Sequence, residues 1–132
     1  MNIAYLLKPK DSVAWINKNS TIRQGLEKFN AHGYTAMPVL NDDGSYFGTV
    51  TEGDFLWYMI NNPDREKYEQ VSIQPLIRKS RNATVSISAD MEMLFDRIIE
   101  QNFVPVVDDR NKFIGIVTRH AFMEYLRKMR NS

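Results

Sequence analysis

Two short segments carry side chains that could bind a phosphorylated ligand. Residues 48–54 read Gly-Thr-Val-Thr-Glu-Gly-Asp, with Thr51 at an expected helix start and Asp54 three positions later. One interpretation is a capping box, in which both side chains satisfy backbone N–H groups. The other is a ligand site, because a helix start favours an anion and a carboxylate can accept hydrogen bonds from ribose hydroxyls. The spacing is compatible with both.

The second segment departs from the capping pattern. Residues 115–121 read Gly-Ile-Val-Thr-Arg-His-Ala, so Thr118 repeats the role of the earlier threonine but Ala121 stands where a carboxylate is expected. Arg119 and His120 fall in the first helical turn, where a cation opposes the helix dipole. An anion docked at this helix start would explain them, since arginine can grip a phosphate with two hydrogen bonds. The alternative is that both side chains point into solvent.

These segments belong to a repeat that spans the chain. Residues 37–42 (Met-Pro-Val-Leu-Asn-Asp) match residues 104–109 (Val-Pro-Val-Val-Asp-Asp), and the two Gly-x-x-Thr segments are separated by the same 67 positions. Near the chain start, Ile3 corresponds to Ile73. Self-similarity over such a period indicates two copies of one structural unit. We therefore predict a first repeat over 1–62, a linker over 63–72 and a second repeat over 73–132.

Each copy predicts the element order β-α-β-β-α. The first helix of each copy starts at a capping residue, Thr21 or Asp90, and continues with apolar residues at helical spacing. Apolar runs around a turn then predict a hairpin. The expected strands are 14–16, 36–40 and 46–51, then 83–85, 103–107 and 112–118, and the expected closing helices are 52–60 and 119–129. One unit leaves a sheet face uncovered, so the two copies are expected to pack together.

Composition excludes several classes of function. The chain has 132 residues, no cysteine and a net charge of +1, which excludes disulfides and thiol nucleophiles and gives no overall attraction to nucleic acids or membranes. Its two histidines fit no metal-ligand motif. We expect a soluble, cytoplasmic protein without catalytic activity. The basic clusters at 78–81 and 127–130 are expected to be solvated surface.

The duplicated Pro-Val hairpin followed by Gly-x-x-Thr, with Asp54 completing the motif in the first copy, resembles a cystathionine-β-synthase (CBS) domain pair, or Bateman module. The resemblance implies an α/β fold of two β-α-β-β-α repeats packed with pseudo-twofold symmetry. It further implies a homodimeric sensor that binds AMP, ADP, ATP, S-adenosylmethionine or cyclic di-AMP and signals to a protein partner. A structural dimerisation module with vestigial clefts is the alternative.

The same resemblance implies two ligand clefts, each built across the repeats. The first would use Ala14, Tyr34, Thr35, Ala36 and Pro38 with Thr118, Arg119 and His120; the second would use Thr84, Phe103, Val104 and Pro105 with Thr51 and Asp54. The Tyr-Thr-Ala run and the Thr-Arg pair are similar to the small cyclic di-AMP-binding CBS proteins of Gram-positive bacteria, with His120 in place of a second arginine. A cyclic dinucleotide has no free ribose diol, so Ala121 matters less for that ligand than for AMP.

Overall fold

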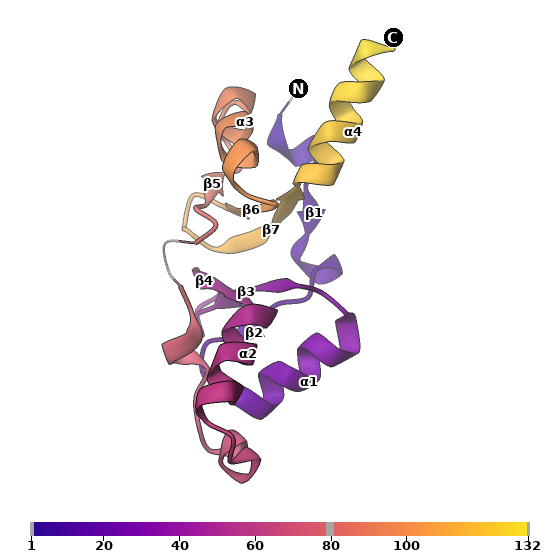
Figure 1. Cartoon of the computed structure of the whole chain (residues 1–132). Helices are drawn as coiled ribbons and strands as arrows, with labels where there is room; N and C mark the ends of the chain where they lie inside the picture. The colour runs from indigo at the N-terminus through magenta and orange to yellow at the C-terminus, as the bar shows by residue number, and fades with distance from the viewer. Residues whose placement is uncertain (1, 79–80, 132) are drawn as a thin grey trace. The chain divides into compact units, whose positions relative to one another are not determined.

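The computed structural model describes residues 2–78 and 81–131, which form two compact units (Figure 1). The central unit comprises Ala14–Arg81. The split unit combines Met1–Val13 with Asn82–Ser132. Each unit is described separately below.

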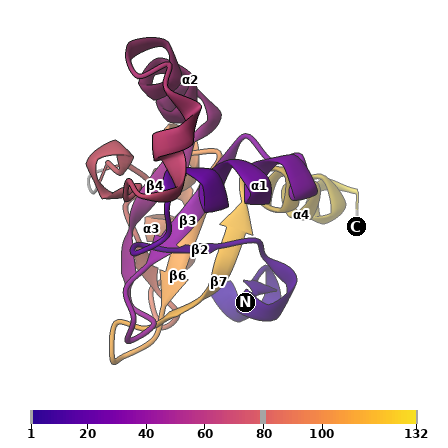
Figure 2. The ribbon, with the colours of Figure 1, turned by 90° about the horizontal axis from the view of Figure 1, so that it is seen from below.

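The central unit is a three-stranded sheet with two helices. Strand β2 (Ile16–Asn17) runs parallel to β3 (Ala36–Leu40), which pairs antiparallel with β4 (Tyr46–Thr51). Helices α1 (Ile22–His32) and α2 (Glu52–Asn61) lie on one face of this sheet (Figures 1 and 2). Two 3-10 turns follow α2, at Arg65–Glu69 and Gln74–Leu76.

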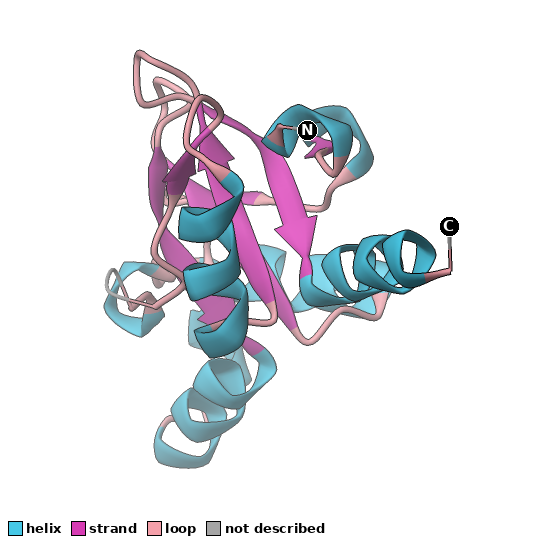
Figure 3. Cartoon of the chain, turned by 90° about the horizontal axis from the view of Figure 1, so that it is seen from above, coloured by secondary structure: helices cyan, strands magenta, loops and turns pink. Residues whose placement is uncertain are grey.

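The split unit repeats this plan and adds a strand. Strand β5 (Val85–Ser86) is parallel to β6 (Phe103–Val107), and β6 is antiparallel to β7 (Phe113–Thr118). The N-terminal strand β1 (Lys8–Pro9), flanked by 3-10 turns at Ile3–Tyr5 and Lys10–Ser12, completes the order β1-β7-β6-β5. The helices of this unit are α3 (Met91–Glu100) and α4 (Arg119–Arg130). Figure 3 shows the helices of the chain in cyan and its strands in magenta.

Local sequence explains where the helices begin. The Thr21 side chain accepts a hydrogen bond from the Gln24 amide, and the Gln24 side chain in turn accepts one from the Thr21 amide, a complete capping box. Asp90 accepts from the Met93 amide in the same way. Both predicted helix starts are therefore confirmed.

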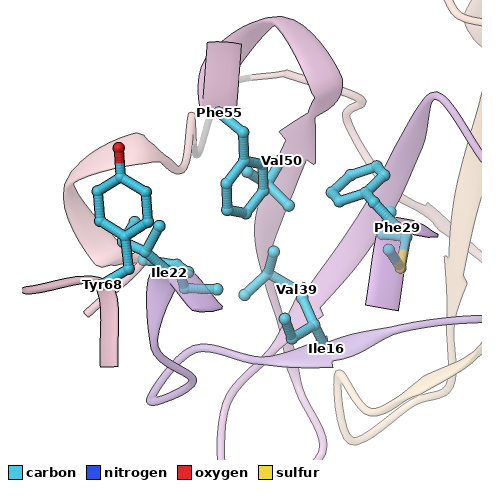
Figure 4. Packing of buried hydrophobic residues seen from close by; sticks show 9 residues of the cluster. Ile16, Ile22, Phe29, Val39, Val50, Phe55 and Tyr68 are labelled. Atoms are coloured by element: carbon cyan, nitrogen blue, oxygen red, sulfur yellow. The ribbon is translucent and has the colours of Figure 1, made fainter. Parts of the chain in front are cut away.

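The central core lies between the sheet and the two helices (Figure 4). Phe29 of α1 meets Phe55 of α2 edge to face, with ring centroids 5.3 Å apart. Around them lie side chains from all three strands, among them Ile16, Val39 and Val50. Aromatic pairs in this geometry add stabilisation beyond the area that they bury.

The segment that leads into each sequence repeat belongs to the unit that holds the sheet and helices of the other repeat. Ile73, which precedes the second repeat's strands, has no exposed surface and lies in the central core. Its counterpart Ile3 is equally buried in the split core. The backbone follows the same rule: Lys8 pairs with Ile116 on β7, and Arg78 forms an isolated bridge with Thr49 on β4. The leading segments are thus exchanged reciprocally.

Four sequence expectations need correction. The first strand of each copy begins later than predicted, at Ile16 and Val85, because the residues before it do not enter the ladder. The third is the last strand, which begins at Phe113 rather than at residue 112. The fourth concerns the apolar residues expected at helical spacing after Asp90, which include Phe95: this residue is 44% exposed, although its ring contacts Phe122. The predicted linker also holds structure, since Tyr68 within it is buried in the central core.

Candidate functional site

The hairpin of the central unit brings three predicted ligand residues to one corner. Ala36, the first residue of β3, pairs with Thr51, the last residue of β4. Thr35 lies beside them, because its carbonyl accepts a hydrogen bond from the Glu52 amide at 3.0 Å. The start of α2 therefore lies directly against the segment that enters β3.

At this corner Thr51 and Asp54 form the predicted capping box. The Thr51 hydroxyl accepts from the Asp54 amide at 3.2 Å, and Asp54 Oδ2 accepts from the Thr51 amide at 2.8 Å. The structural interpretation of this motif is thus confirmed. The Asp54 carboxylate has further capacity, since a carboxylate accepts about four hydrogen bonds.

An arginine uses that capacity. Arg81 Nη1 donates to Asp54 Oδ2 at 2.7 Å and Nη2 donates to Oδ1 at 3.2 Å. Two parallel bonds of this kind form a two-point ion pair. Arg78 Nε lies 3.9 Å from Oδ1, but the Arg78 side chain is 70% exposed whereas that of Asp54 is only 9% exposed. The sequence expectation that this basic cluster is solvated surface is therefore wrong for Arg81. Two members of the cluster, Lys79 and Ser80, lie outside the described residues.

These contacts hold the Asp54 carboxyl in its charged form. Burial raises its pKa, but the hydrogen bonds from Arg81 and from the Thr51 amide lower it by more, so the pKa lies below the ordinary 3.8. Because the pKa of Asp54 is depressed in the folded state, its charged carboxylate stabilises the folded protein above pH 3.8. This contribution is lost as the pH falls through the pKa that Asp54 has in the folded protein. Asp54 is ionised at neutral pH.

The main chain of Arg81 is anchored as well. The Tyr46 hydroxyl donates to the Arg81 carbonyl at 3.1 Å and lies 2.5 Å from Thr49 Oγ1. Burial raises the pKa of Tyr46 to about 12, so the phenol keeps its proton in the neutral range. Arg78 adds a backbone bond to the Thr49 carbonyl at 3.4 Å. Arg78 and Arg81 are therefore attached to β4 by main-chain contacts.

The residues of the central unit that were predicted for the first cleft differ in exposure. Tyr34 is 40% exposed and stacks on His32, with ring centroids 5.8 Å apart and planes within 4° of parallel. Ala14 packs against the central core and Pro38 is buried in β3, in agreement with ordinary packing for these two small residues. The exposed Tyr34 ring offers a flat surface beside Thr35.

In the split unit the equivalent corner is formed by Phe103 and Thr118, which pair across β6 and β7. Thr118 caps α4 by accepting from the Ala121 amide at 3.0 Å. Three further residues named for the clefts have the following positions: Val104 and Pro105 are buried in β6, and the Thr84 carbonyl accepts from Arg97 Nε at 3.3 Å. His120 is exposed.

Arg119 neither points into solvent nor remains at the start of its own helix. Its guanidinium donates to the Ile98 carbonyl at 3.0 Å, to the Ile99 carbonyl at 3.3 Å and to Asn102 Oδ1 at 3.0 Å. These acceptors lie at or just beyond the C-terminal end of α3, where a cation is favourable. The cation that looked misplaced by sequence therefore satisfies the carbonyls of a different helix.

This position predicts a ligand-independent role for Arg119. We expect Arg119→Ala to lower the free energy of unfolding by about 1–3 kcal/mol, because it leaves helix-end carbonyls without a charged donor. The matched control is Arg127→Ala on α4, which removes an exposed pair with Glu124. Loss of such a surface pair is expected to lower the free energy of unfolding by less than about 0.5 kcal/mol. Urea unfolding without nucleotide measures both; equal losses would refute the helix-end role.

Each predicted cleft draws residues from both units, so the two complete clefts remain predictions. Within the described ranges, no group of three or more acidic or histidine side chains is arranged to hold a metal ion. Among the same residues, no helix is both long and apolar enough to span a bilayer.

The fold and the repeated corners define a pair of CBS domains. The CBS domain model matches residues 6–61 and 74–128, so the chain belongs to the CBS domain family. A CBS domain-containing protein of Dictyostelium discoideum is 26% identical over 126 residues, covering 89% of this chain and 87% of the relative.

Solved structures agree on the fold. CbpB in complex with c-di-AMP is similar with a TM-score of 0.89 and 20% identity, over 99% of this chain and 87% of that one. CBSX2 in complex with AMP is similar with a TM-score of 0.78 and 21% identity, over 98% of each chain. The predicted α/β CBS pair, with mixed sheets and helices in two repeats, is confirmed.

Proposed function

We propose that the chain is a regulatory module that binds an adenine nucleotide, either AMP, ADP or ATP or cyclic di-AMP, and transmits occupancy to a protein partner. The observation that carries this proposal is the corner at the start of α2. There an ionised carboxylate and a hydroxyl, those of Asp54 and Thr51, lie together at the start of a helix. The family membership and the nucleotide complexes of the similar structures support it.

The chemistry of the corner suits a nucleoside. Asp54 can accept hydrogen bonds from the 2′ and 3′ hydroxyls of a ribose, and the Thr51 hydroxyl has a hydrogen to donate to a phosphate or sugar oxygen. In the first predicted cleft, which does not include Asp54, the exposed Tyr34 ring provides a face on which an adenine can stack.

Calorimetric titration with AMP, ADP, ATP and cyclic di-AMP tests the proposal. We expect at least one of the four to bind with a Kd below about 1 mM, equivalent to about 4 kcal/mol of binding free energy. If none of them does, the regulatory function is excluded. Chromatography after incubation checks for chemical change, and an intact nucleotide is the expected result for a sensor that is not an enzyme.

Asp54 gives this test a residue-level prediction. We expect Asp54→Asn to lower the affinity for AMP by about tenfold, because an amide accepts hydrogen bonds from the ribose diol less strongly than a carboxylate does. Cyclic di-AMP has no free diol, so its affinity is expected to fall by less in the same variant. The matched control is Glu52→Gln, which removes a carboxylate from the exposed side of the same helical turn. Equal losses in both variants would remove Asp54 from the site.

A second candidate, a dimerisation module without a ligand, is favoured by a different observation. On α2 the apolar side chains of Leu56, Trp57 and Ile60 are 56%, 65% and 59% exposed. An apolar face of this kind is typical of a protein interface, and a homodimer is the partner that we propose for it. Light scattering of the titrated samples separates the candidates: a dimer indifferent to all four nucleotides, none of which binds, favours the structural module.

A further inference from the structure

The Asp54 carboxylate, which the proposed function assigns to a ribose, is already occupied by the protein. Its two oxygens accept hydrogen bonds from the two terminal nitrogens of Arg81, at 2.7 and 3.2 Å. A vicinal diol would approach the same two oxygens. A diol and the guanidinium therefore compete for one acceptor pair.

We propose that Arg81 is the specificity-determining residue of this site: a ligand with a free ribose diol must displace its guanidinium from Asp54, whereas a ligand without a diol need not. This inference rests on the proposed function. The displacement lowers the apparent affinity of diol ligands by the strength of the ion pair, and so favours ligands such as a 3′,5′-cyclic dinucleotide over mononucleotides.

The ion pair between Asp54 and Arg81 is partly buried and is not a loose surface contact. The Asp54 side chain is 9% exposed and that of Arg81 is 24% exposed. Solvent therefore screens the pair only in part. The Arg81 carbonyl is held by Tyr46, which fixes the position from which the guanidinium reaches Asp54. A flexible surface lysine or arginine would have neither restraint.

The location of Arg81 gives the competition a consequence for the whole chain. Arg81 is the last residue of the central unit, and Asn82 begins the split unit. The Asn82 side chain donates to the Phe103 carbonyl at 3.0 Å, so this residue is anchored as soon as the chain enters the split unit. A diol that releases the guanidinium therefore removes a restraint at the residue where the central unit ends.

The repeat shows that this ion pair is specific to one of the two equivalent corners. Positions 3 and 73 are equivalent, so an offset of 70 places Asp11 opposite Arg81, and the offset of 67 places Ala121 opposite Asp54. The second corner thus has neither the carboxylate nor the arginine. We expect the Asp54 corner to distinguish ligands with a ribose diol from ligands without one, and the other corner to bind both equally.

Adenosine and 2′,3′-dideoxyadenosine are the probes that isolate the diol, because neither carries a phosphate. In Arg81→Gln we expect adenosine to bind about tenfold more tightly than in the native protein, since it no longer displaces a charge-assisted pair. The affinity of 2′,3′-dideoxyadenosine should change by less than about twofold, because it makes no demand on the carboxylate. Calorimetry or a thermal-shift titration measures the four combinations.

Arg78→Gln is the matched control. It removes the same charge from the same neighbourhood, but Arg78 is 3.9 Å from the carboxylate and its side chain is 70% exposed. The ratio of the two affinities should therefore stay at its native value. An Arg81→Gln protein with an unchanged ratio would overturn the inference and leave the proposed function intact. If adenosine, AMP and cyclic di-AMP bind to neither protein, the proposed function fails and the inference fails with it.

Discussion

Ile73→Ala is expected to lower the free energy of unfolding by about 2–5 kcal/mol, the usual cost of removing a large buried aliphatic side chain. Ile73 is fully buried in the central core although it belongs by sequence to the second repeat. The control is Arg65→Ala, which also truncates a long side chain in the same unit, but at an exposed position outside the apolar face of α2. Both tryptophans, Trp15 and Trp57, lie in this unit, so urea unfolding followed by their fluorescence reports the effect.

The exchange makes a second, reciprocal test possible. Ile3→Ala should destabilise the split unit by a similar amount, because Ile3 is fully buried in the split core. Ile99→Ala changes a side chain that is 58% exposed. Such a surface change should have little effect. Circular dichroism follows this pair. If Ile73→Ala were no more costly than Arg65→Ala, the leading segment of the second repeat would not be an integral part of the central unit.

Features set by near neighbours in the chain were predictable. The caps at Thr21 and Asp90, the capping box of Thr51 and the strand 36–40 all depend on residues within a few positions, and each is present as expected. Hydrophobic spacing and turn residues report such local preferences directly. The repeat then indicated that a fold found in one half would recur in the other.

Features that depend on distant contacts were not predictable in this way. Arg81 reaches a carboxylate 27 positions away, and Arg119 reaches carbonyls 20 and 21 positions away. Neither contact has a spacing signature, so sequence reasoning assigned Arg81 to solvent and Arg119 to a phosphate. A partial signal existed for the first: the repeat offsets put Asp11 and Ala121, which form no such pair, at the positions equivalent to Arg81 and Asp54.

The two arginines show why a charge at a helix start is ambiguous evidence for a ligand. A guanidinium has several donors on a long side chain, so it can satisfy a helix end or a carboxylate elsewhere in the protein as readily as an anion from solution. At Arg119 the protein itself supplies the acceptors. At Asp54 the protein supplies the donor, with which a ribose diol has to compete in the function that we propose. The same side-chain chemistry thus serves the fold at one corner and, in that proposal, ligand selection at the other.

The second prediction with a large effect concerns Gly115, where the N-terminal strand β1 pairs with β7. Gly115 has φ +153°, and a Cβ atom placed there would be 2.2 Å from the Lys8 carbonyl oxygen. Residues that carry a Cβ atom disfavour this backbone conformation. Backbone atoms cannot rotate away as a side chain can. We expect Gly115→Ala to lower the free energy of unfolding by about 2–4 kcal/mol, through backbone strain and displacement of β1.

Gly53→Ala is the control for this substitution, and its effect should have the opposite sign. Gly53 lies in the first turn of α2, where an added Cβ meets Thr51 Oγ1 at an ordinary 3.7 Å. Alanine is the better helix former there by about 0.5–1 kcal/mol. Hydrogen exchange of residues 3–12 should increase in Gly115→Ala alone. Protection of that segment at the native level would mean that β1 is not held against Gly115, and the exchange of leading segments would then be wrong for the split unit.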